Sequence, residues 1–368
     1  MTRTTPPFRA DHVGSLLRPA SLKDVRARRE SGKATPAELT AAEDAAIEQI
    51  ISRQAEVGLR SATDGEFRRA MWHFDFLERL EGVESFCSDH GIAFQGGIET
   101  RPKGLRVVGK LGFSGHPMVE HFRFLQARTR ATAKMTIPSP SVLHFRGGRR
   151  AIDPSVYPDM EEFYRDLGQA YRGAVEAFAD AGCRYLQLDE VNLAYLCDRE
   201  QRRILRDRGD NPEHLPAIYA DMINTAISGR PSGMTITMHL CRGNFRSSWI
   251  AQGGYEPVAE LLFNQIMVDG YFMEFDSDRA GGFDPLRFVP KGKTVVLGLV
   301  TSKTGALETV EYLERRIEEA SRFVDLAQLC LSPQCGFAST EEGNVLTEEE
   351  QWAKLARIVE VAEKVWGV

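Results

Sequence analysis

Short apolar segments alternate with longer amphipathic segments along most of the chain. The short segments are rich in Val, Ile, Leu and Met, which is typical of buried parallel strands. They predict eight strands, at residues 9–14, 60–64, 133–138, 184–189, 234–240, 271–275, 294–300 and 327–332. Between them, apolar residues at helical spacing predict helices at 36–57, 160–181, 212–228, 255–267, 307–322 and 348–366.

Eight strands that alternate with helices favour an α/β fold of the (β/α)8 TIM-barrel class. A doubly wound parallel sheet is the alternative, but no Gly-x-Gly-x-x-Gly motif follows the first strand. Glycines clustered at about 83–115 predict a β-hairpin inserted after the second strand. We therefore expect one barrel domain over residues 1–368.

Composition and charge exclude several classes of partner. The 368 residues include 46 Lys and Arg against 52 Asp and Glu, which gives a formal charge of −6 and argues against nucleic acid as the main partner. No apolar run approaches the ~18 residues that a membrane helix needs, and the first residues lack the apolar core of a signal peptide. Six scattered cysteines predict free thiols in a reducing cytoplasm. The sequence leaves the oligomeric state open.

Polar residues gather where the predicted strands end. Examples are Ser15 after the first strand, Glu66 after the second and Asp189 at the end of the fourth. The carboxyl ends of barrel strands converge on one mouth, where barrel enzymes place their active sites. These ends are therefore the expected site.

Four of these strand-end residues form a candidate metal site. His239 and Cys241 are two positions apart on one strand, so their side chains point to the same side. Glu274 lies at the end of the adjacent predicted strand, and Cys335, three strands on, can reach the same mouth. One His, two Cys and one Glu suit Zn²⁺, although the His-x-Cys pair alone would also be typical of core residues. Zinc with thiolate ligands can bind a substrate thiol and lower its pKa, and an incoming sulfur could displace Glu274.

Several segments together resemble the catalytic domain of cobalamin-independent methionine synthase, and most closely its short, single-barrel members. The resemblance rests on His239-Leu-Cys241-Arg-Gly-Asn, Met273-Glu274-Phe-Asp276, Ser332-Pro-Gln-Cys335-Gly336, His12-Val-Gly-Ser15, Asp64-Gly-Glu66 and Gln187-Leu-Asp189-Glu190. It implies a zinc-dependent methyltransferase that converts homocysteine to methionine, with His239, Cys241, Glu274 and Cys335 as the zinc ligands.

The resemblance also implies that Ser15, Glu66 and Asp189 hold the amino-acid part of homocysteine. Two carboxylates can pair with an α-ammonium group, and a Gly-Ser turn can offer N–H groups to an α-carboxylate. Structural ion pairs with Arg68 or Arg69 are the alternative for the two acidic residues.

The sequence departs from the family on the side of the methyl donor. Longer members carry a second barrel that helps to bind a methyltetrahydrofolate, and we expect none here. A family histidine after the seventh strand, thought to protonate the departing folate, is replaced within Val300-Thr-Ser-Lys303. An aromatic residue that stacks on the pterin would have to be His144 or Phe145. Trp72, His73 and Phe74 could form a different donor pocket, or simply pack in a loop. The donor is left open between methyltetrahydrofolate and a methylcobalamin-type carrier.

Three other functions remain as alternatives. An epoxyalkane:coenzyme M transferase uses the same thiol chemistry, but coenzyme M has no ammonium group for Glu66 and Asp189 to bind. A zinc hydrolase is disfavoured because sulfur ligands lower the Lewis acidity of the ion. A non-catalytic zinc-binding or thiol-binding module would leave the two carboxylates unexplained.

Overall fold

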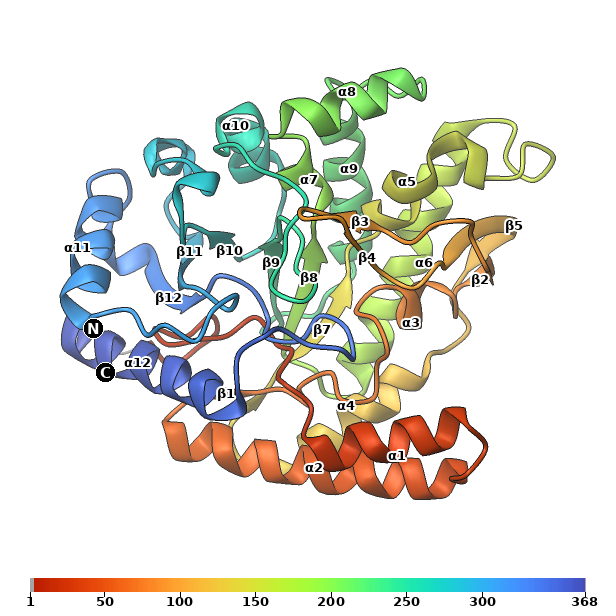
Figure 1. Ribbon diagram of the computed structural model, residues 1–368. Coiled ribbons are helices and arrows are strands. Elements are labelled where there is room, and N and C mark those ends of the chain that lie inside the picture. The colour runs from red at the N-terminus through yellow and green to blue at the C-terminus, as the bar shows by residue number, and fades with distance from the viewer. Residues whose placement is uncertain (1–2, 368) are drawn as a thin grey trace.

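A parallel β-sheet with helices around it forms the centre of the molecule, as a computed structural model describes it for residues 3–367 (Figure 1). Six strands are hydrogen-bonded in the order β12-β11-β10-β9-β8-β7, all parallel. They are β7 (Met135–Pro138), β8 (Tyr185–Glu190), β9 (Thr235–Leu240), β10 (Gly270–Glu274), β11 (Thr294–Val300) and β12 (Leu329–Pro333). The predicted α/β class with a parallel sheet is confirmed.

Two further segments lie at the edges of this sheet. On one side, β6 (Thr132–Ala133) leads into β7 and pairs in parallel with β1 (Ser61–Ala62). On the other side, Ala10 forms a parallel bridge with Leu331 of β12. The prediction of a strand over 9–14 is therefore wrong beyond Ala10.

The side chain of Asp11 helps to hold the N-terminal segment, which has one bridge to β12. Its buried carboxylate accepts hydrogen bonds from the backbone N–H of Phe8 (3.0 Å) and His12 (2.8 Å). It also accepts from Ser61 Oγ (3.1 Å) and Tyr185 Oη (2.8 Å), and Lys134 Nζ lies 3.5 Å away. One carboxylate thus joins the segment to β1, to β8 and to the β6–β7 chain.

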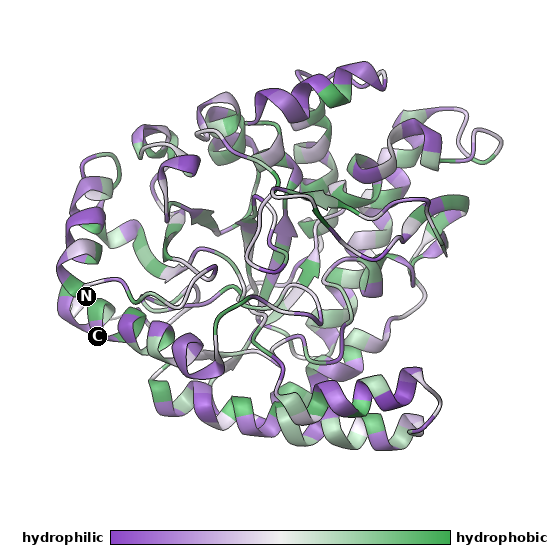
Figure 2. Cartoon of the chain, viewed as in Figure 1, coloured by the Kyte–Doolittle hydropathy of each residue, from purple (hydrophilic) through white to green (hydrophobic). Residues whose placement is uncertain are grey.

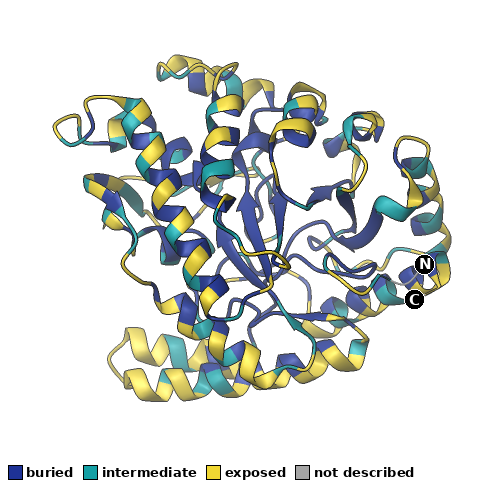
Figure 3. Ribbon diagram, turned by 180° about the vertical axis from the view of Figure 1, so that it is seen from behind, coloured by how far each residue is buried: buried dark blue, intermediate teal, exposed yellow. Residues whose placement is uncertain are grey.

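The helices lie outside the strands and turn their polar faces outward (Figures 1 and 2). The longer ones are α1 (Ala20–Glu30), α2 (Pro36–Val57), α4 (Pro117–Arg128), α6 (Met160–Asp180), α8 (Arg199–Asp207), α9 (Leu215–Ile227), α10 (Glu256–Gln265), α11 (Val310–Ser321) and α12 (Glu348–Trp366). Short ones are α3 (Phe74–Leu77), α5 (Ser141–Gly147) and α7 (Asn192–Tyr195), with 3-10 turns at Gly148–Ala151, Asp278–Ala280, Asp284–Phe288 and Leu326–Gln328. Seen from behind, the strands are buried and the outer helix faces are exposed (Figure 3).

Local signals in the sequence set the ends of the best-predicted helices. Thr35 caps α2 in a reciprocal bond with Glu38, Pro36 is its first residue, and Gly58 ends it in a left-handed conformation at φ 97°. Thr347 and Glu350 form the same box on α12. The helices predicted at 36–57 and 348–366 have these bounds, whereas α1, α4 and α8 were not predicted.

Antiparallel pairs occupy the glycine-rich segment. β2 (Glu81–Phe86) pairs with β5 (Gly104–Gly112), and β3 (Ala93–Phe94) pairs with β4 (Ile98–Glu99). A side chain at Gly82 (φ 79°) would lie 2.4 Å from the carbonyl oxygen of Gly109, so the close approach of these strands needs glycine. None of the helices within residues 3–367 is both long and apolar enough to cross a membrane.

Replacing Lys134 tests the buried Asp11 network. Lys134→Met removes the ammonium group that faces Asp11 and lies over the rings of Tyr185 and Phe272. We expect a loss of about 3–5 kcal/mol in the free energy of unfolding, because a buried carboxylate is left without its counter-charge. Urea denaturation measures this loss. Lys110→Met, which removes an exposed partner of Glu162, is the control and should cost about 1 kcal/mol or less. Equal losses in the two variants would contradict this role of Lys134.

Candidate active site

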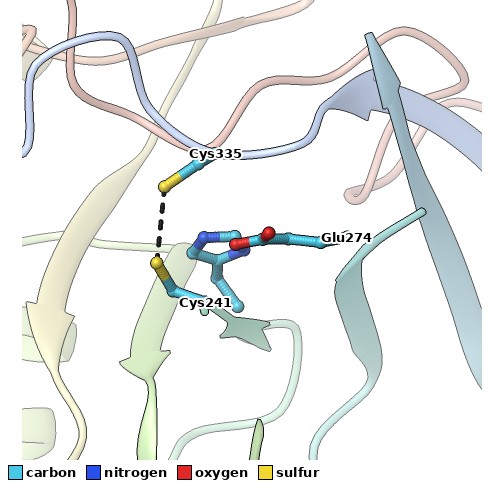
Figure 4. Close-up of side chains that lie close together, drawn as sticks. Cys241, Glu274 and Cys335 are labelled. Carbon is cyan, nitrogen blue, oxygen red and sulfur yellow. Dashed lines mark hydrogen bonds between the residues drawn. The ribbon is translucent and has the colours of Figure 1, made fainter. Parts of the chain in front are cut away.

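Four buried side chains meet beyond the carboxyl ends of the strands. His239 lies on β9 and Cys241 follows it directly, Glu274 is the last residue of β10, and Cys335 lies two residues after β12. One potential ligand atom from each of the four lies within 4.8 Å of the others. The Sγ atoms of Cys241 and Cys335 face each other at 3.5 Å, and the Glu274 carboxylate points into the same space (Figure 4). The structure thus brings together all four residues predicted as metal ligands.

The sheet register produces this convergence. His239 lies opposite Phe272 in the β9–β10 pair, so Glu274 lies two residues further along the neighbouring strand. Asp189 lies opposite His239 in the β8–β9 pair. Because alternate residues of a strand face the same side, His239, Glu274 and Asp189 end on one face of the sheet.

The donor set matches what a metal ion needs. Neither ring nitrogen of His239 has a hydrogen-bond partner within the described residues, although the side chain is buried. The hydrogen bond with Cys241 lowers the pKa of Cys335 well below its ordinary value, and the same bond raises the pKa of Cys241. One thiol of the pair therefore ionises readily and the second does not. A cation between them would favour ionisation of both.

Glu66, Asp189 and Ser15 line the same cavity as His239, Cys241 and Cys335. Glu66 Oε1 accepts a bond of 2.9 Å from Thr136 Oγ1, and Asp189 Oδ1 accepts one of 2.7 Å from Gln187 Nε2. Burial and the nearby Glu66 raise the pKa of Asp189 to about 7. The two predicted acidic residues are therefore neighbours that repel each other in the absence of a cation.

Structural ion pairing was the alternative role for these two acidic residues, and only Glu66 shows such a pair with an arginine among residues 3–367. Arg69 NH1 lies 3.4 Å from Glu66 Oε2, while Arg68 pairs with Glu43 and Asp44 instead. Asp189 has no ion pair with an arginine among residues 3–367. The site therefore keeps unbalanced negative charge.

Ser15 is fixed by the loop that follows β12. Its carbonyl accepts from the N–H of Phe337, and its Oγ accepts from the N–H of Ala338 at 3.3 Å. A Cβ atom at Gly336 would lie 1.9 Å from Ser15 Oγ, so the approach of these two loops requires glycine.

Loop residues complete the cavity. Trp72 and His73, expected as a possible donor pocket, line it, whereas Phe74 lines a neighbouring cavity. Other lining residues were not predicted: Met71, Ile92, Phe94, Thr100, Arg146, Tyr195 and Asn244. Most of them lie in loops that the tertiary fold brings together, and no spacing in the sequence marks them.

Neither of the two donor-side segments, 144–145 and 301–303, lines the cavities of the site. His144 and Phe145 line neither cavity; His144 instead bonds to Tyr219 Oη at 2.8 Å and Tyr164 Oη at 3.1 Å. Arg146, one residue later, lines both cavities. Lys303 bonds to Gly243 O, Asn244 Oδ1 and Ser248 O, and no residue of 301–303 lines either cavity.

Comparison with known proteins agrees with this geometry. A family model described as the catalytic domain of cobalamin-independent synthase matches residues 8–364. The chain belongs to this family. The resemblance read from the motifs is confirmed, and with it the prediction of an enzyme of the methyltransferase class.

Three similar proteins illustrate the range of this family. YxjH of Bacillus subtilis is 52% identical over 362 residues, which cover 98% of this chain and 95% of YxjH. A candidate vitamin-B12-independent methionine synthase from Listeria monocytogenes has a solved structure with 42% identity, a TM-score of 0.80 and full coverage of both chains. A protein named methionine synthase from Pyrococcus abyssi is 23% identical over 352 residues, 94% of this chain and 91% of its own.

The raised pKa of Asp189 predicts a pH-dependent effect of its replacement. The native state holds the Asp189 proton up to about pH 7 and the unfolded state releases it near the ordinary value of 3.8, so this group lowers stability as the pH rises between these values. Asp189→Asn removes the dependence. We expect the variant to gain stability relative to the unsubstituted protein between about pH 5 and about pH 8, measured by urea denaturation without substrate.

Asp24→Asn is the control, since Asp24 is exposed on α1. A stability difference for Asp189→Asn that stays constant between the two pH values would contradict the shifted titration.

Proposed function

We propose that this protein is a zinc-dependent transferase that methylates the sulfur of homocysteine and so forms methionine. The observation that carries the proposal is one cavity lined both by the His239, Cys241 and Cys335 cluster and by the Glu66 and Asp189 carboxylates. A thiol that also bears an ammonium group fits both parts.

His239, Cys241, Glu274 and Cys335 would hold the zinc ion. Nitrogen, sulfur and carboxylate oxygen are the donors that zinc takes in four-coordinate sites, and the free ring nitrogens of His239 support this assignment. Zinc bound there supplies a Lewis acid that lowers the pKa of the substrate thiol, so that the sulfur reacts as a thiolate.

Glu66, Asp189 and Ser15 would hold the amino-acid end of the substrate. A substrate ammonium between Glu66 and Asp189 would remove the repulsion that raises the pKa of Asp189. The turn at Gly14 and Ser15 would receive the substrate carboxylate. Coenzyme M carries no ammonium group, so this half of the site favours homocysteine over it.

The methyl donor would enter from the neighbouring cavity, which shares His73, Ile92 and Arg146 with the first. Four cationic side chains and no carboxylate, among the described residues, line this cavity; the cations are Lys103, Arg106, Arg146 and Arg150. Phe74 and Phe86 provide aromatic walls. A flat donor with anionic groups suits these walls, as a methyltetrahydrofolate would; a methylcobalamin-type carrier with its phosphate shares the anionic character.

The proposal also concerns the fold. We propose that the chain is one (β/α)8 barrel domain with an inserted β-hairpin at about 83–115. The parallel order from Ala10 through β12 to β7 and β1 supports closure, as do the Ser61–Asp11 bond and the bond from Leu16 N–H to Gly65 O. All six cysteines are free thiols, which supports a cytoplasmic location.

Replacing single cluster residues tests the metal assignment. Cys335→Ser and His239→Ala should each lose tightly bound zinc, since a structural or catalytic site needs about three to four protein ligands. Metal analysis after dialysis measures zinc per chain, and circular dichroism checks the fold. Cys87→Ser, which changes an exposed cysteine, should keep its zinc. Zinc that survives in both cluster variants would show that these residues are not the ligands.

Methionine formation tests the reaction itself. The zinc-loaded protein is incubated with homocysteine and, in parallel, with methylcobalamin or methyltetrahydrofolate, and methionine is measured by mass spectrometry. We expect product with at least one donor and about 100-fold less product with Glu66→Gln, because one partner of the substrate ammonium is lost. No product with either donor, zinc still bound, would refute homocysteine methylation from these donors.

A further inference from the structure

Glu274 differs from the other members of the cluster in its surroundings. It is fully buried and does not line the cavity that His239, Cys241 and Cys335 share. Its Oε1 accepts a hydrogen bond of 2.8 Å from the backbone N–H of Arg242. Its Oε2 lies 3.2 Å from Arg279 NH2. Both carboxylate oxygens therefore have protein partners.

Arg279 is positioned to serve two acidic residues. The same NH2 atom lies 3.3 Å from Asp276 Oδ1, and the guanidinium lies over the ring of Trp249 at 4.9 Å. Arg279 belongs to the short 3-10 turn Asp278–Ala280, which follows β10. It is the ion-pair partner that the described residues provide for Glu274. With Asp276 beside it, Arg279 keeps an anionic partner whether or not Glu274 turns away.

We propose that Arg279 is a positioning residue that holds the Glu274 carboxylate when the substrate thiol replaces it at the ion. The inference rests on the proposed function. In this exchange the bond between Glu274 oxygen and the ion would break, a bond from the substrate sulfur would form, and the thiol proton would go to solvent. The Glu274 carboxylate would stay ionised and pair with Arg279. When Glu274 binds the ion again, Arg279 would pair with Asp276 instead.

Burial makes such a partner necessary. An ionised carboxylate that leaves a cation inside a protein is strongly destabilised unless another cation is close. Lys303 is already bonded to Gly243 O, Asn244 Oδ1 and Ser248 O, and the guanidinium of Arg242 lies over Tyr255. Arg279 is thus the cation that forms an ion pair with the carboxylate itself, and it would compete with an ion for that carboxylate.

Competition and simple orientation predict opposite results for Arg279→Gln. If Arg279 competes for Glu274, its loss should tighten zinc binding about five- to tenfold and weaken homocysteine binding by a similar factor. If Arg279 only orients a ligand, its loss should weaken zinc binding about 10–100-fold. Zinc affinity is measured by competition with a chromogenic chelator. Homocysteine binding is measured by titrating the Co²⁺-substituted protein and following the sulfur-to-cobalt absorption band.

Matched variants define the comparison. Arg279→Lys keeps the charge and should restore part of both affinities. Arg287→Gln removes an exposed arginine that pairs with Glu256 and should change neither. Asp276→Asn removes the second anionic partner of Arg279, so that Arg279 pairs more strongly with Glu274. Zinc should then bind more weakly and homocysteine more tightly. This variant decides the question if Arg279→Gln does not fold.

Unchanged or weaker zinc binding in Arg279→Gln would overturn the inference, as would tighter zinc binding in Asp276→Asn. The unsubstituted protein tests the proposed function separately. A cobalt spectrum that homocysteine does not change would contradict that function, while the zinc affinities of the variants would still decide the competition between Arg279 and the ion.

Discussion

The buried carboxylate of Asp11 is the interaction on which the position of the N-terminal segment depends. It accepts from the backbone of Phe8 and His12 and from side chains of β1 and β8, with Lys134 as counter-charge. A short segment without a strand partner on one side could otherwise shift along the sheet. Because Asp11 fixes it, Gly14 and Ser15 arrive beside Glu66 and the loop after β12, where the candidate site lies.

On the other side of the site, the register of the parallel strands positions the side chains. The β8–β9 and β9–β10 pairs place Asp189, His239 and Glu274 within a few residues of three adjacent strand ends. None of the three needs a long loop to reach the others. The remaining member, Cys335, comes from the loop after β12, which Ser15 holds through two backbone N–H groups. Ser15 therefore links the N-terminal segment to the loop that carries Cys335.

How far the sequence predicted this arrangement depends on how local each signal is. The ends of α2 and α12 follow from caps within four residues, and the metal cluster follows from side-chain alternation and strand order. The strand predicted at 9–14 does not continue beyond Ala10 because the next backbone carbonyls accept from side chains instead, those of Lys134, Gln187 and Thr63. The helix α1 was missed because Pro19 gives it no side-chain cap and Leu22 is its one buried residue. Arg146 lines the cavities because the tertiary fold brings α5 beside distant segments, so no spacing reveals it. Arg279 lies only five residues after Glu274, but the sequence does not show that the two side chains pair.

The distribution of charge determines which ligands the candidate site favours. Glu66 and Asp189 are buried together with too little positive charge, and the Cys241–Cys335 pair ionises only in part. Glu274 differs, because Lys303, Arg279 and Arg242 lower its pKa against the effect of burial. An ammonium group would relieve the repulsion between Glu66 and Asp189, and a divalent cation would allow both thiols of the Cys241–Cys335 pair to ionise. A ligand with both an amine and a thiol can therefore interact with both parts of the site, which favours an amino-acid thiol over a simple one.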